Sequence, residues 1–162
     1  MKSIKLNEKK MIQSKDDKKK VHEPFKLKSL MLEFDEYVRI FIIPQIPKER
    51  MEYREAMRDT LDKIWHEIFF SAGTTDRARR HHLLALRVEL AVFEVYFTEI
   101  REVCYRGKGH KMLDTGAARR FEVCSSKMHA VMNFVWSWIK NEGKRTDNRS
   151  NEAKAMIDTE EA

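Results

Sequence analysis

The sequence has few of the residues that make tight turns. Its 162 residues include only five Gly and three Pro. A β-sandwich or β-barrel needs many tight turns, and those turns depend on Gly and Pro. We therefore exclude both architectures and expect a small number of long elements. A chain of this length is expected to form one domain.

Cysteine is scarce as well. Cys104 and Cys124 are too few for the disulfide framework of a small secreted protein. Residues 1–22 carry charges throughout and lack the apolar run of a secretion signal. No uncharged apolar stretch approaches the roughly 18 residues that suggest a membrane span. These absences favour a cytoplasmic protein with two reduced, packed thiols.

Positive charge is in excess only at the N-terminus. The net charge is +6, and residues 1–28 account for all of it, with ten Lys against four acidic residues. Residues 1–22 are Lys-rich and have no aromatic residue, so we expect a disordered tail. Lys18, Lys19 and Lys20 are candidate nucleic-acid contacts through counterion release, with a merely solubilising tail as the alternative.

Apolar residues recur every three or four positions along four long segments, as in amphipathic helices. The segments cover approximately residues 24–43, 48–72, 77–105 and 114–141. Long helices joined by short loops predict an all-α, up-down-up-down four-helix bundle. We assign the bundle to residues 23–142. The fourth helix is expected to end near Gly143, which leaves residues 143–162 as a flexible polar tail.

The third predicted helix is apolar over an unusually wide arc. One stripe consists of Leu86, Leu90, Phe93 and Phe97. A neighbouring stripe consists of Leu84, Val88, Ala91 and Val95. A single bundle core rarely needs both stripes in full, so we expect one of them to contact another subunit. The first stripe is our candidate oligomer interface.

The sequence contains no arrangement typical of an enzyme. Di-iron four-helix bundles use Glu-x-x-His pairs, but no His here has an acidic residue three positions before it. Cys104 and Cys124 lack close Cys or His partners for zinc. The short Gly107-Lys108-Gly109 run does not have the spacing of a phosphate-binding loop. We therefore predict a non-enzymatic protein with no catalytic residues, metal site or cofactor.

A basic cluster opens the third predicted helix. It consists of Arg77, Arg79, Arg80, His81 and His82, followed by Arg87. Cations at this position oppose the helix dipole, and Arg can fork onto phosphate oxygens. We predict that the four arginines bind nucleic acid; the alternative is a solvated turn partly neutralised by Asp76. The opposite end of the bundle offers a second basic group: Arg106, Lys108, Lys111, Arg119 and Arg120.

Two tryptophans lie close together in the fourth predicted helix. Trp136 and Trp138 are two positions apart, so their side chains point in different directions. One is expected to pack in the core, and the other to cover a groove or a subunit contact.

Several segments together resemble one family of small four-helix-bundle proteins. The similar segments are Ile46-Pro47-Lys48-Glu49-Arg50 with Tyr53-Arg54, Ser71-Ala72, Arg77 to Arg80 leading into Leu83-Leu84-Ala85-Leu86, and Trp138-Ile139-Lys140. The family includes the Avd proteins, which are accessory variability determinants of diversity-generating retroelements. It also includes proteins encoded by intervening sequences in bacterial 23S ribosomal RNA genes. The resemblance covers about residues 25–141.

The resemblance implies a ring-shaped homopentamer with basic surfaces. Such a protein would bind a reverse transcriptase and its template RNA or complementary DNA, and would support mutagenic reverse transcription without doing chemistry itself. Two alternatives remain open. One is an rRNA-associated bundle without a polymerase partner, and the other is a purely structural homo-oligomer.

Overall fold

The computed structural model describes residues 24–106 and 115–160, which contain four long helices and no β-strand. The N-terminal helix covers residues 24–37 and continues as a π-helical turn, η1 (Val38–Ile42), and a 3-10 turn, η2 (Ile43–Gln45). A second 3-10 turn, η3 (Lys48–Arg50), leads into α2 (Met51–Gly73). The last two helices are α3 (Asp76–Arg106) and α4 (Thr115–Glu160).

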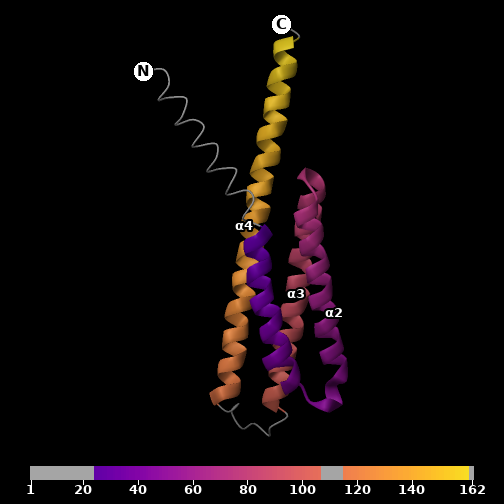
Figure 1. Ribbon diagram of the computed structural model, residues 1–162, viewed down its shortest axis with the longest axis vertical. Helices are drawn as coiled ribbons and strands as arrows, with labels where there is room; N and C mark the ends of the chain where they lie inside the picture. Colours follow the sequence, from indigo (N-terminus) through magenta and orange to yellow (C-terminus); the bar gives the residue numbers. More distant parts are fainter. Residues whose placement is uncertain (1–23, 107–114, 161–162) are drawn as a thin grey trace, which may run out of the picture.

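Successive helices run in opposite directions and pack side by side, as Figure 1 shows. The predicted all-helical fold with four helices is therefore confirmed for the described residues. The extents of α2 and α3 also agree with the sequence pattern. The Lys-rich residues 1–22 and the Gly107–Lys108–Gly109 run lie outside the described residues.

The break between the N-terminal helix and α2 is held by backbone groups and one arginine. The Ile46 N–H donates to the Ile43 carbonyl at 3.1 Å, and the Arg50 N–H donates to the Pro47 carbonyl at 2.9 Å. Arg54, one turn into α2, donates from Nε to the Ile46 carbonyl at 3.1 Å and from a second guanidinium nitrogen to the same oxygen. Because the Arg50 N–H donates to the Pro47 carbonyl, it does not reach the Ile46 carbonyl, and Arg54 satisfies that acceptor instead.

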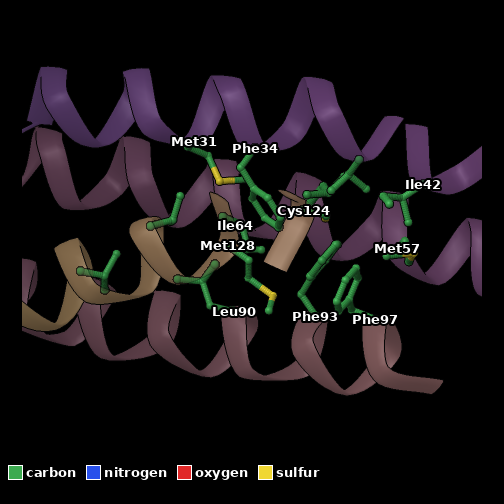
Figure 2. Close-up of a cluster of buried hydrophobic side chains, with 14 of the residues drawn as sticks. Met31, Phe34, Ile42, Met57, Ile64, Leu90, Phe93, Phe97, Cys124 and Met128 are labelled. Atoms are coloured by element: carbon green, nitrogen blue, oxygen red, sulfur yellow. The ribbon is translucent and has the colours of Figure 1, made fainter. Parts of the chain in front are cut away.

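All four helices contribute to one core (Figure 2). Phe34 of the N-terminal helix packs edge-to-face on Phe93 of α3, with ring centroids 5.1 Å apart. Cys124 of α4 is also buried here, and burial raises the pKa of its thiol to about 12. A thiol with that pKa is protonated and unreactive at neutral pH.

The core also corrects our predicted oligomer interface. The side chains of Leu86, Leu90, Phe93 and Phe97 are at most 4% exposed, because all four pack between helices of the same chain. They are not available to a second subunit. The other stripe, on the opposite side of α3, is the one left outside: Leu84 is 41% exposed, Val88 60% and Val95 57%.

The predicted end of the fourth helix near Gly143 is wrong. α4 continues through Gly143 without a break and ends at Glu160. One Gly inside a helix costs only about 1 kcal/mol relative to Ala, which its neighbours can offset. Residues 147–159 are all exposed, and in Figure 1 this part of α4 projects past the α2–α3 turn.

The helices do not have the composition of membrane spans. In the two described ranges, no helix combines the length and the apolar character needed to cross a bilayer.

Candidate nucleic-acid interface

The α2–α3 turn places two of the predicted arginines at the surface. Asp76 opens α3 with a left-handed backbone (φ 53°), a conformation that Asp tolerates better than most residues. Arg77 and Arg80 follow in the first turn, and both are exposed. Among the described residues neither has an ion-pair partner, so both guanidinium groups can reach an external anion.

Arg79 points the other way, into the molecule. Its Nε donates to the Ser71 carbonyl at 3.0 Å, and a terminal nitrogen lies 3.3 Å from the Glu142 carboxylate. Its guanidinium carbon also lies 5.7 Å from the centre of the Trp138 ring. Arg79 therefore ties α2, α3 and α4 together, which the sequence did not reveal, and we remove it from the candidate contacts.

Glu142 is the centre of this internal network. Its side chain is only 4% exposed, and the same carboxylate oxygen accepts from Arg79, from Arg145 at 3.0 Å and from the Trp138 indole at 3.3 Å. A carboxylate this buried is tolerable only because it is paired and hydrogen-bonded. Two turns beyond Glu142, Arg149 of α4 donates to Asp76 at the start of α3.

This ionic cluster borders a cavity of about 340 Å³ between the α2–α3 turn and α4. Its lining consists of Thr75, Asp76, Arg79, Glu142, Arg145, Asn148, Arg149 and Glu152. The three arginines are matched by three acidic residues, and each arginine is engaged by one of them. The cavity is therefore electrically balanced and is a poor site for an added anion.

A second group of cations surrounds Trp136 on the α3–α4 side of the bundle. The Arg87 guanidinium carbon lies 4.0 Å from the centre of the Trp136 ring, and Lys140 Nζ lies 5.1 Å from it. Trp136 is 39% exposed, whereas Trp138 is 2% exposed. The prediction that one tryptophan faces the core and the other a groove is thus confirmed.

The Trp136 ring borders a mainly apolar hollow of about 200 Å³. The hollow is lined by Arg87, Leu90, Met132, Asn133, Val135 and Trp136. An exposed indole flanked by two cations suits a nucleic acid, because bases stack on aromatic rings while Arg and Lys bind phosphates. We call Arg87, Trp136 and Lys140 the tryptophan cluster. Our sequence reasoning had assigned no binding role to Trp136 or Lys140.

The remaining predicted contacts are not brought into this site. Lys18, Lys19 and Lys20 lie outside the described residues. At the opposite end of the bundle Arg119 and Arg120 are exposed, and the Arg120 guanidinium carbon lies 5.8 Å from the Phe41 ring centre. His82 is occupied within the bundle, since its Nδ1 lies 2.8 Å from the Glu67 carboxylate.

The described residues contain no group of three or more His, Cys, Asp or Glu side chains placed to hold a metal ion. Comparison with known proteins gives no further guide to function: no family model, no curated protein and no solved structure matches this chain.

Proposed function

We propose that this chain is a non-enzymatic accessory protein that associates with itself and binds nucleic acid. We further propose that its partners are the reverse transcriptase of a diversity-generating retroelement and the template RNA or complementary DNA of that enzyme. The observation that carries the nucleic-acid part is the tryptophan cluster, in which an exposed indole lies between Arg87 and Lys140. Support for a polymerase partner comes from the resemblance of residues 46–54, 71–72, 77–86 and 138–140 to Avd-like proteins.

The charge distribution of the bundle supports a local binding surface. The net charge of +6 is already accounted for by residues 1–28. A nucleic-acid surface on the bundle must therefore consist of cations that local acids do not neutralise. Arg77, Arg80, Arg87 and Lys140 meet this condition, since none of them forms an ion pair among the described residues. The Lys-rich N-terminal residues would add a diffuse, salt-sensitive contribution.

Binding is tested with a fluorescently labelled single-stranded RNA, by anisotropy over a series of salt concentrations. The Arg87→Ala, Lys140→Ala double variant should bind more weakly, and the slope of log K against log salt should fall by roughly 0.7 for each lost phosphate contact. The matched control is Arg58→Ala with Lys63→Ala. It removes the same two charges from an exposed part of α2 that contains Asp59 and Asp62. Unchanged affinity and unchanged slope in the first variant would contradict the proposed surface.

The stacking part of the proposal has its own test. Trp136→Ala should cost roughly 1–3 kcal/mol of binding per stacked base, with little change in the salt slope, because no charge is removed. Trp136→Phe keeps an aromatic face and should retain most of the affinity. Equal losses in the two variants would show that the ring does not stack on a base.

The polymerase partner is tested by purifying the tagged protein from its native cells and identifying any reverse transcriptase that co-purifies with it. Recovery of the enzyme with the bundle supports the retroelement function. Recovery of ribosomal RNA without a polymerase supports the rRNA-associated alternative. A protein that binds neither would be a structural homo-oligomer. The exposed apolar residues Leu84, Val88 and Val95 of α3 favour that alternative.

A further inference from the structure

α3 has two apolar stripes on opposite sides. The inner one packs in the core, as described above. The outer one is exposed at every position: Arg77, His81, Leu84, Val88, Ala91, Val95, Thr98 and Glu102. These positions alternate in steps of four and three, which is the spacing of a seam where two helices pack along their length. We call this set the outer seam.

The outer seam changes character along its length. Its first two positions are Arg77 and His81, and its last is Glu102. Its four central positions are apolar: Leu84, Val88, Ala91 and Val95. Exposed Glu99 and Arg101 lie beside that end, so its three charged residues carry a net negative charge. The order along the helix is therefore basic, apolar, acidic.

This order is complementary to itself when reversed. The midpoint of the seam lies between Glu89 and Leu90, and each seam position has a counterpart at the same distance on the other side. In an antiparallel pair, Leu84 of one copy meets Val95 of the other, and Val88 meets Ala91. At the ends, Arg77 of each copy meets Glu102 of the other, with Glu99 close by. In the dimer Arg77 thus belongs to the interface, and Arg80, Arg87 and Lys140 remain for nucleic acid. Opposite charges therefore meet at both ends, and apolar side chains meet in the middle.

We propose that the outer seam of α3 is the interface of a two-fold symmetric, antiparallel dimer of this chain. The occupant is a second copy rather than an unrelated helix, because the seam matches its own reverse in both charge and polarity. A two-fold interface of this kind uses the same residues on both copies. The inference does not rest on the proposed nucleic-acid function.

The two-fold axis also determines where the tryptophan clusters lie. An axis perpendicular to the plane of the paired helices places both copies of α4 on the same side of the dimer. The dimer would present two tryptophan clusters on one side and form a longer surface for a single nucleic-acid strand.

The first test is the mass of the purified protein in solution at micromolar concentration, measured by light scattering. We expect about twice the chain mass of 19.3 kDa. Val88→Glu places two like charges at the centre of the dimer and should raise the dissociation constant roughly a hundredfold or more. Leu32→Glu is the matched control: Leu32 is 58% exposed and Val88 60%, but Leu32 lies on the N-terminal helix, away from the outer seam.

The control variant should remain a dimer, and circular dichroism should show that both variants are folded. A monomeric wild-type protein would overturn the proposal. So would a mass of five chains, the ring number implied by the family resemblance, because a two-fold interface gives an even number of copies. A five-chain mass would leave the nucleic-acid function untouched.

The second test fixes the direction of the two helices by disulfide formation in a Cys104→Ser background. Leu84→Cys chains are mixed with Val95→Cys chains and oxidised. The antiparallel register brings these two positions together, while two copies of position 84 would be roughly 16 Å apart along the axis. Since a disulfide needs Cα atoms about 4.4–6.8 Å apart, we expect only mixed dimers. A predominance of 84–84 and 95–95 bridges would indicate a parallel pair and overturn the proposed register.

Discussion

The two halves of α4 use the same face of the helix to contact the rest of the bundle, but that face is apolar in the first half and charged in the second. In the first half Cys124, Met128, Val131 and Val135 are buried in the core. Past Trp138 the same spacing of three and four continues, but the next positions are Glu142, Arg145 and Arg149. The first half is held by apolar burial, and the second by ion pairs to α3.

This difference shows that a helix can be held in a bundle by two separate means. Apolar burial tolerates salt and depends on shape, because the cost of a lost methylene grows with the cavity that it leaves. The ionic half depends on the pairing of one buried carboxylate with its donors. Changes in the two halves should therefore have different sizes and different sensitivities to solvent.

The largest effect is expected in the apolar half. Met128 is 1% exposed, and Met128→Ala should lower the free energy of unfolding by about 2–5 kcal/mol through lost burial and a cavity. Met128→Leu conserves volume and should cost less than about 1.5 kcal/mol. Urea denaturation measures both variants. A loss in the alanine variant no larger than that in the leucine variant would mean that the site collapses around the deletion.

A smaller effect is expected at the centre of the ionic half. Glu142→Gln keeps the shape but leaves Arg79 and Arg145 without their charge partner, so it should cost about 1–3 kcal/mol. This lies below the usual penalty for a fully buried pair, because the Arg79 side chain is 21% exposed and the Arg145 side chain 34%. The control, Glu152→Gln on the exposed part of α4, should be within about 0.5 kcal/mol of wild type. Similar losses of unfolding free energy in the two variants would show that the ion pairs of Glu142 contribute no more than an exposed carboxylate does.

Because Cys124 is buried in the apolar half of α4, we expect the unfolding free energy to depend on pH in the alkaline range. Burial raises the pKa of Cys124 from 9.0 to about 12, so the folded state keeps its proton where the unfolded chain has lost it. The stabilisation is complete below pH 9 and is lost as the pH rises toward 12, so the unfolding free energy should fall over that range. In Cys124→Ala the fall should be shallower, as measured by denaturation at several pH values. If the unfolding free energies of wild type and Cys124→Ala changed in parallel with pH, the raised pKa of Cys124 would be contradicted.

The smallest effect concerns the junction where we had predicted a helix end. Gly143 lies inside α4, and an added Cβ would meet nothing within 4 Å. Gly143→Ala should therefore stabilise the protein by about 0.5–1 kcal/mol through helix propensity. If the helix stopped at Gly143 in solution, the same change would be neutral or harmful, and a lower melting temperature would show this.

Much of the fold was predictable because the apolar spacing is regular. Pro44 and Pro47 mark the break between the first two helices, and the core positions of α3 follow the three-and-four spacing closely. The assignment of Leu86 and Phe93 to a subunit contact failed for a simple reason. Two apolar stripes on one helix do not reveal which of them faces the core until the neighbouring helices are in place.

The ionic cluster was less predictable, since its members are far apart in the chain. Arg79 and Glu142 are 63 residues apart, and a basic residue at a helix start gives no sign of a buried partner. One signal was available: Glu142 continues the buried spacing of Val135 and Trp138. An acidic residue at a core position indicates a paired charge, because an unpaired one would be too costly.

The exposed last part of α4 has a consequence for how the protein melts. Residues 150–159 are exposed and lie beyond the Arg149–Asp76 ion pair, so their helix rests on local hydrogen bonds and helix propensity. A helix of that length is marginal in water by itself. Heating should therefore unwind this segment gradually from its end, and its ellipticity at 222 nm should decline before the bundle unfolds cooperatively. A single two-state fit to the melting curve would then assign to the bundle an enthalpy that partly belongs to fraying.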